Sequence, residues 1–393
     1  MRTSQILSCF ILAVIAIGCD NNKSSLHEAP IITFEKAIGN SDWQMGLASV
    51  QSSDGGYLIA GITGDSSGID ENGYLVKINS SGDTLWTRSY GMTYRDGFFD
   101  IKSTSDGGVI IVGRSIDDIQ YDNVYVIKLD AISNLQWSRY YGSLNDSEEA
   151  ASILQTPDGG YLICGRNGIN GVYYDVYLLK INSSGDSLWS KTYSRAGNNF
   201  GSSILNTNDG GYIIAGHTVD SGNEDVYLVK TDATGNITWN KTYGGSGNDI
   251  GRDIKQTKDN GYIIVGRMEN DIYLIKANSS GDTVWTRTFD GYGYWAGSSV
   301  ELADDGGFLV AGSVLNNSNN SSDVYLLKVS ANGDSLWSRS FGGAADDYGY
   351  SIKQCLDGGY FITGMTYSYG VGGDVYVIKV NEDGNFNEIE KVY

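Results

Sequence analysis

The sequence of 393 residues contains only two prolines, two histidines and four cysteines. Because His27 and His217 are the only histidines, a histidine-rich metal site is excluded by count. Basic residues are also few, since 27 Lys and Arg stand against 47 Asp and Glu and give a formal net charge of −20. A surface this acidic repels phosphate backbones, so we expect no nucleic-acid partner.

Motifs of common catalytic sites are absent as well. The sequence has no CxxC motif and no nucleotide-binding loop followed by an expected helix. What it has instead is 53 glycines, 28 tyrosines and only 19% charged residues. This composition is typical of strands joined by tight turns, and it excludes a helical or disordered chain.

The N-terminal residues form a pattern typical of an export signal. Arg2 precedes the apolar run Ile6–Ile17, which is too short to span a bilayer comfortably. The run ends in "AIGC" at Ala16–Cys19, which resembles the lipobox of bacterial lipoproteins. The resemblance implies a signal peptide over residues 1–18 and a lipid on Cys19 that anchors the protein in a membrane. An alanine stands where leucine is usual, so cleavage of an ordinary secreted protein stays an alternative.

The rest of the chain divides into a short tether and one large domain. Residues 19–30, which start at the lipidated cysteine, have no apolar pattern and are expected to be flexible. Residues 31–393 contain seven copies of a repeat whose clearest element is a "DGG"-like turn, with copies 46 to 52 residues apart. The turns begin at Asp54, Asp106, Asp158, Asp209, Asp259, Asp305 and Asp357.

Each repeat contains four runs of alternating and β-branched residues, bounded by Gly, Asn and Asp, which is the pattern of β-hairpins. A period near fifty residues with four strands predicts an all-β fold, a single seven-bladed β-propeller of four-stranded antiparallel blades. A tryptophan recurs in the fourth strand, and we expect it to wedge between adjacent blades. These tryptophans are Trp86, Trp137, Trp189, Trp239, Trp285 and Trp337.

The N-terminal segment of the domain predicts how the ring closes. Ile31–Gly39 aligns without gaps on Asn236–Gly244 and places Phe34 where the fourth strand has Trp239. We therefore expect this segment to be the outer strand of the last blade. The C-terminal segment Phe386–Tyr393 competes for the same place but needs one extra residue to align.

The repeat resembles the tryptophan-docking repeat of the PQQ-like propellers, as in "DVYLLKINSSGDSLWSKTY" at Asp175–Tyr193. In that family, quinoprotein enzymes have eight such blades and a calcium-linked cofactor, often with adjacent cysteines. Seven repeats, and two cysteines at different repeat positions, Cys164 and Cys355, argue against a quinoprotein, so we expect no cofactor and no metal. A weaker resemblance is to bulb-type lectins, but Gln256–Tyr262 does not fit their sugar-binding motif. The two cysteines are expected to be buried free thiols.

Two of the four connections in each repeat are uniform turns, and the other two vary freely in length and composition. Alternating strand directions place the uniform turns on one face and the variable loops on the other. Uniform turns need no function beyond turn chemistry, whereas variable loops on a rigid scaffold are typical of a binding surface. The sequence therefore predicts a ligand face on the variable side.

Comparing equivalent positions of the repeats brings out a charge pattern on this face. Where the second strand carries Arg, the first carries Asp or Glu, and we expect the two side chains to face each other across the hairpin. They form either ion pairs within a blade or a polar ring around the central funnel. The candidate ligand-face residues are Asp96, Arg114, Glu148, Arg166, Asp249, Arg267, Trp295 and Asp347.

These observations favour a non-catalytic lipoprotein of the cell envelope. We expect a monomer, lipid-anchored in the cell envelope, in the outer membrane or alternatively in the inner one, and facing the periplasm or the outside. Its propeller is expected to bind an envelope protein or a glycan on its variable face. The alternative is a carbohydrate-active enzyme of the glycosidase type that uses the carboxylates of the funnel.

Overall fold

The computed structural model describes residues 31–65, 70–91, 95–116, 121–143, 146–169 and 173–387. The predicted signal peptide, Cys19 and the tether over residues 19–30 lie outside the described residues, as do residues 388–393. The described residues form one compact unit.

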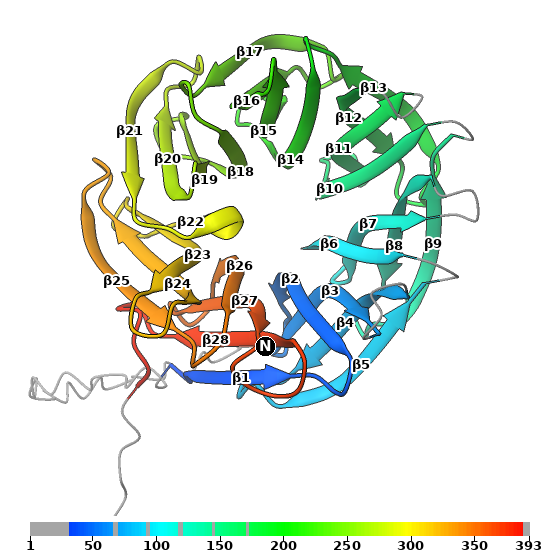
Figure 1. Cartoon of the computed structure of the whole chain (residues 1–393). Helices are drawn as coiled ribbons and strands as arrows, with labels where there is room; N and C mark the ends of the chain where they lie inside the picture. The colour runs from blue at the N-terminus through cyan, green and yellow to red at the C-terminus, as the bar shows by residue number, and fades with distance from the viewer. Residues whose placement is uncertain are drawn as a thin grey trace, which may run out of the picture. The chain divides into compact units, whose positions relative to one another are not determined.

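Seven four-stranded antiparallel sheets follow one another around a ring (Figure 1), which confirms the predicted seven-bladed propeller. In the first six blades the strands follow chain order from the innermost to the outermost. The first three blades contain β2 (Trp43–Gln51), β3 (Tyr57–Gly64), β4 (Glu71–Ile78) and β5 (Thr84–Tyr90); β6 (Asp96–Ser103), β7 (Val109–Ile116), β8 (Asp122–Leu129) and β9 (Leu135–Tyr141); and β10 (Ser147–Gln155), β11 (Tyr161–Ile169), β12 (Tyr173–Ile181) and β13 (Ser187–Tyr193).

The remaining blades have the same construction, and one short 3₁₀-helix precedes the sixth. Their strands are β14 (Asn198–Asn206), β15 (Tyr212–Asp220), β16 (Asn223–Thr231) and β17 (Ile237–Tyr243); β18 (Asp249–Gln256), β19 (Tyr262–Met268), β20 (Asp271–Ala277) and β21 (Thr283–Phe289); β22 (Gly297–Leu302) after the helix η1 (Gly293–Trp295), β23 (Phe308–Asn316), β24 (Ser321–Val329) and β25 (Ser335–Phe341); and β26 (Asp347–Gln354), β27 (Tyr360–Thr366), β28 (Asp374–Val380) and β1 (Phe34–Ile38).

The N-terminal strand closes the ring, as predicted. β1 pairs with β28 and supplies the outermost strand of the seventh blade, so the two ends of the domain share one sheet (Figure 1). Phe34 lies opposite Lys379, just as Trp239 lies opposite Lys230 in the fourth blade. The alignment of the N-terminal segment with a fourth strand therefore holds residue by residue.

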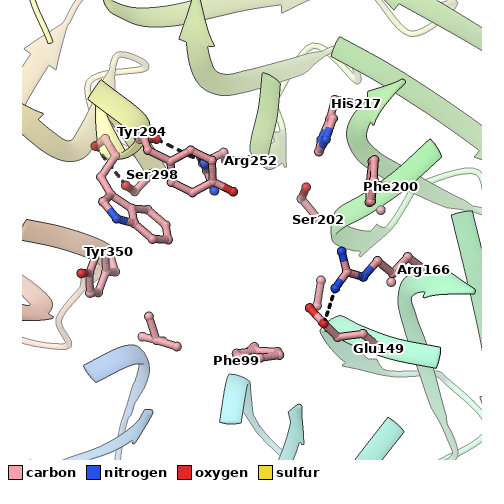
Figure 2. A pocket seen from close by; sticks show the side chains of 15 residues that line it. Phe99, Glu149, Arg166, Phe200, Ser202, His217, Arg252, Tyr294, Ser298 and Tyr350 are labelled. Atoms are coloured by element: carbon pink, nitrogen blue, oxygen red, sulfur yellow. Dashed lines mark hydrogen bonds and ion pairs between the residues drawn. The ribbon is translucent and has the colours of Figure 1, made fainter. Parts of the chain in front are cut away.

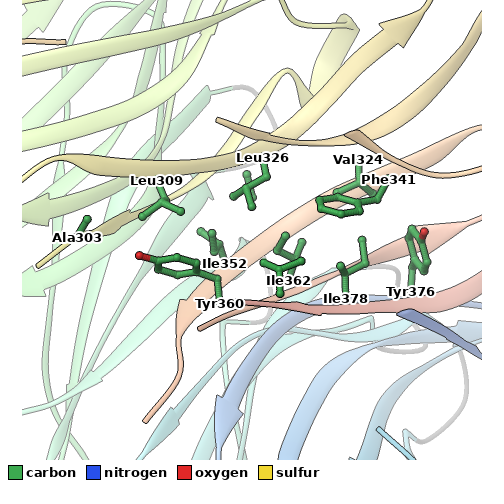
Figure 3. Packing of buried hydrophobic residues seen from close by; sticks show 12 residues of the cluster. Ala303, Leu309, Val324, Leu326, Phe341, Ile352, Tyr360, Ile362, Tyr376 and Ile378 are labelled. Carbon is green, nitrogen blue, oxygen red and sulfur yellow. The ribbon is translucent and has the colours of Figure 1, made fainter. Parts of the chain in front are cut away.

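The hydrophobic core is divided into seven clusters, and each cluster combines side chains of two neighbouring blades. Between the sixth and seventh blades, Leu309 and Leu326 pack against Ile362 and Ile378 (Figure 3). Each such buried side chain contributes about 1.5–3 kcal/mol relative to an exposed one. Because no blade buries its faces alone, apolar residues recur at the same positions of every repeat.

The recurring tryptophans lie at the seams between blades, but on the outer rim, where each is only half-buried. Trp189 packs on the turn of the next blade at Gly235, where a Cβ would come within 2.8 Å of the indole. The Nζ atom of Lys191 lies 5.4 Å from the centre of the same ring. The glycine therefore leaves the space that the indole occupies, and a larger residue in this turn would collide with it. Equivalent contacts join Phe34 to Gly82, Trp137 to Gly185, Trp239 to Gly281, Trp285 to Gly333 and Trp337 to Gly384.

A lysine of the third strand holds the "DGG" turn in all seven blades. The Lys180 side chain is 6% exposed, and its Nζ atom lies 2.8 Å from a carboxylate oxygen of Asp158. The turn motif thus has a structural role, because it satisfies a buried ammonium group. The seven pairs are Lys77–Asp54, Lys128–Asp106, Lys180–Asp158, Lys230–Asp209, Lys276–Asp259, Lys328–Asp305 and Lys379–Asp357.

These pairs predict a loss of stability in acid. Hydrogen bonds from Lys180 and Thr156 lower the pKa of Asp158 to about 2, below the value of about 3.9 of an unfolded aspartate. The contribution of the pair is present above pH 4 and is lost as the pH falls through 2. Because the carboxylate is 61% exposed and screened by solvent, we expect less than about 1 kcal/mol for this one pair.

The measurement is the thermal midpoint at pH 4 and at pH 2 and constant ionic strength, for the native protein and for Asp158→Asn. The native protein should lose more stability than the variant over this interval. An equal loss in both proteins would show that the pair does not contribute.

Cys164 and Cys355 are buried free thiols, which confirms that prediction.

Candidate binding site in the axial channel

Every innermost strand carries a β-bulge at the same position. In β18 the pairing with β19 passes from Gly251–Gly266 directly to Asp253–Val265, so Arg252 is an extra residue without a partner in the ladder. A bulge of this kind turns the side chain of the extra residue away from the regular alternation. The seven bulged residues are Leu47, Phe99, Ala151, Ser202, Arg252, Ser298 and Tyr350.

All seven bulged residues line one cavity of about 480 Å³, which the innermost strands surround at the centre of the ring. Figure 2 shows side chains from blades around the ring directed toward this common space. The bulge position differs in chemical character from blade to blade, whereas the packing positions around it are repeated. The other lining residues are Glu149, Gly165, Arg166, Phe200, Gly201, His217, Tyr294 and Trp295.

The predicted facing of acids and arginines across the hairpins is wrong. Asp96 lies opposite Ser115, while Arg114 lies opposite Gly97. The same offset of one residue occurs in the third and fifth blades. Because side chains alternate between the faces of a sheet, this offset places the acid and the arginine on opposite faces.

The four predicted acids are instead buried at the start of the innermost strands, where they hold the connection from the preceding blade. The backbone N–H of Gly245 donates to Asp249 at 2.9 Å, and that of Gly343 donates to Asp347 at 2.8 Å. Burial raises the pKa of Asp249. None of these acids is among the residues that line the cavity, and the full set is Asp96, Glu148, Asp249 and Asp347.

The predicted arginines form ion pairs with carboxylates other than the predicted ones. Arg166 pairs with Glu149 at 2.7 Å within the third blade. Arg114 reaches back to Glu71 of the first blade at 3.2 Å and forward to Glu149 at 3.7 Å. The ion pairs of Arg114 therefore join neighbouring blades, and of the three predicted arginines only Arg166 lines the cavity.

Arg267 repeats this arrangement, because it reaches back to Glu224 of the preceding blade at 3.2 Å.

Arg252, which the sequence did not single out, lies against aromatic rings. Its guanidinium carbon is 3.9 Å from the ring centre of Tyr294 and 4.7 Å from that of Trp295. Its Nη2 atom donates to the carbonyl oxygen of Tyr294 at 3.2 Å (Figure 2). Trp295, a predicted ligand-face residue, lines the cavity from η1 and lies 4.6 Å from the ring of Tyr350.

His217 forms the opposite wall of the cavity with Phe200, on which it stacks at 4.5 Å between ring centres. Burial, together with the positive charges of Arg252, Arg267 and Arg166, lowers the pKa of this imidazole to about 3. The imidazole is therefore neutral at physiological pH and does not add a charge to the cavity.

A second hollow of about 550 Å³ adjoins the cavity over the sixth, seventh and first blades. The two hollows share Tyr294, Trp295 and Tyr350. Its rim is rich in tyrosine, and Tyr294 and Tyr367 are 52% and 50% exposed. Together the two hollows form one concave surface rich in aromatic side chains, which continues into the cavity at the centre of the ring.

Within the described residues, no group of three or more His, Cys, Asp or Glu is placed to hold a metal ion. No helix in that part of the chain is both long and apolar enough to cross a membrane.

A closed propeller with a lined axial cavity is a fold class that supports a binding scaffold in general. The chain belongs to the PQQ-like family described as "Outer membrane protein assembly factor BamB", whose profile matches residues 28–286, more than half of the chain. The description of this family links it to the bacterial envelope. No curated protein matches the chain.

Solved structures confirm the fold. The BP39L lectin of Burkholderia pseudomallei matches with a TM-score of 0.59 at 11% identity, covering 88% of this chain and 98% of the lectin. Chaetomium thermophilum Sqt1 bound to the N-terminus of ribosomal protein L10 matches with a TM-score of 0.53 at 11% identity, covering 88% and 100%. YCF48 bound to a D1 peptide matches with a TM-score of 0.53 at 8% identity, covering 89% and 95%.

Proposed function

We propose that this protein is an exported lipoprotein of the bacterial envelope whose propeller binds a protein or a glycan in the axial cavity, without catalysing a reaction. The observation that carries the proposal is the set of seven bulged residues, which differ from blade to blade inside an otherwise repeated scaffold. Variable residues that face a cavity inside a repeated scaffold are typical of a binding site. Cys19 would carry the lipid, which keeps the propeller at a membrane.

The charge arrangement favours binding over hydrolysis. Glycoside hydrolysis requires two carboxyl groups on either side of the scissile bond. Among the described residues that line the axial cavity, Glu149 is the one carboxylate, and it is held by Arg166 at 2.7 Å. The glycosidase alternative would need a second carboxylate at this position.

The family and the similar structures give general support. The lectin and the peptide-bound propellers among them are named as binding proteins. Their identity to this chain is too low to transfer a ligand, so the partner is defined here by the chemistry of the cavity.

The test is a screen of the full chain against a glycan panel and against purified envelope proteins, repeated with Trp295→Ala. The matched control is Leu188→Ala, which removes an apolar side chain 55% exposed on the outer strand β13. We expect Trp295→Ala to weaken the binding of any retained ligand at least tenfold, because removing a buried aromatic anchor typically costs about 2 kcal/mol. Equal binding by both variants would contradict the assignment of the axial cavity.

A further inference from the structure

Two arginines line the cavity, Arg166 and Arg252, and only Arg166 forms an ion pair with a carboxylate of the described residues. Arg114, Arg166 and Arg267 each have a carboxylate oxygen within 3.2 Å, whereas no ion pair involves Arg252 within the described part of the chain. Its Nε atom is buried and finds no acceptor among the described residues. The Nε atoms of Arg114, Arg166 and Arg267 share this feature, so the missing carboxylate is what distinguishes Arg252 and leaves its guanidinium able to pair with a carboxylate of a ligand.

The position of the guanidinium favours a planar anion. Its central carbon lies 3.9 Å from the ring centre of Tyr294 and 4.7 Å from that of Trp295, and these two rings are nearly perpendicular to each other. A guanidinium held over aromatic rings can still donate two parallel hydrogen bonds to a carboxylate from the N–H groups that have no acceptor in the protein. On the far side of the cavity, the Nε atom of Arg166 is also buried without an acceptor.

The walls suit a sugar ring. Trp295 and Tyr350 lie side by side with 4.6 Å between their ring centres, Ser298 lies on the same side of the cavity, and Ser202 lies on the opposite side near His217 (Figure 2). A pyranose presents C–H groups on its face and hydroxyl groups at its edge, so it needs this mixture of rings and polar groups.

Size and charge limit the ligand further. A volume of about 480 Å³ lies in the range of small-ligand sites. The chain carries a formal net charge of −20, so a long polyanion is repelled by the body of the protein while one carboxylate can reach Arg252.

We propose that the axial cavity recognises an acidic sugar residue, with its carboxylate on Arg252 and its ring on the wall formed by Trp295 and Tyr350. This inference rests on the proposed function, because it names the ligand class of the same cavity.

The experiment is calorimetric titration of the full chain with D-glucuronate and D-galacturonate, and with D-glucose and D-galactose as neutral counterparts. We expect the uronates to bind at least tenfold more tightly than the neutral sugars. Arg252→Gln should remove this preference. The matched control is Arg287→Gln, because Arg287 also lies over an indole, that of Trp285 at 5.6 Å, and also donates to a backbone carbonyl, but on the outer rim.

Equal affinity for uronates and neutral sugars, or a preference that survives Arg252→Gln, would overturn the inference. So would the absence of any saccharide binding. If a protein ligand from the screen still depends on Trp295 in that case, the proposed function stands and only the sugar assignment fails. If no ligand depends on Trp295, both fail.

Discussion

Deleting residues 31–40 is expected to abolish the cooperative thermal unfolding of the propeller. The deletion removes β1, so β28 loses its outer partner, keeps only β27, and becomes an exposed edge of the seventh blade. It also removes Phe34 and Ile38 from the cluster between the seventh and first blades, where each contributes about 1.5–3 kcal/mol. Because every blade is stabilised by two neighbours, opening one seam exposes the faces of both.

The measurement is differential scanning calorimetry of the full chain with and without the deletion. The control is a deletion of equal length over residues 20–29, which removes none of the described residues. A single transition at an unchanged temperature after removal of residues 31–40 would refute closure of the ring by this strand.

Gly266→Ala is expected to destabilise the protein by about 3 kcal/mol. Gly266 lies on β19 opposite the bulge, and a Cβ there would come within 1.7 Å of the carbonyl oxygen of Ile250. Since that oxygen belongs to the backbone of β18, the strand itself must move. The movement would also displace Arg252 from the cavity wall, so ligand binding should fall together with stability.

The matched control is Gly245→Ala, because no atom lies within 4 Å of a Cβ placed at Gly245. Its effect on stability should stay within about 0.5 kcal/mol. Chemical denaturation of both variants and of the native protein measures the difference. If the two variants were equally stable, the close approach of the β18 backbone to Gly266 would be contradicted.

The architecture could be predicted from the sequence because its evidence is repeated seven times. The period of the turn motif counts the blades, and the alignment that places Phe34 on Trp239 identifies the closing strand. Each signal depends on local residue patterns that one blade shares with the next.

The site could be predicted only in part, because it depends on register. The comparison of repeats selected Arg166 and Trp295, which line the cavity, but paired the arginines with acids one residue out of register. The bulged residues stand three positions after those acids, and simple strand alternation does not predict a bulge. The signal that could have revealed them is the glycine present in the second strand of all seven repeats, such as Gly266.

The surroundings of Arg252 could not be predicted from the sequence either. Tyr294 and Trp295 come from the connection before the sixth blade, while Arg252 belongs to the fifth. Their contact is a consequence of how adjacent blades meet around the axis.

The most direct test of the account is amide hydrogen exchange of the full chain with and without a ligand retained in the screen. The account predicts slower exchange along β14, β18 and β22 and in η1, around the bulged residues of the axial cavity. Protection confined to the "DGG" turns or to the outer strands would place the ligand elsewhere and contradict it.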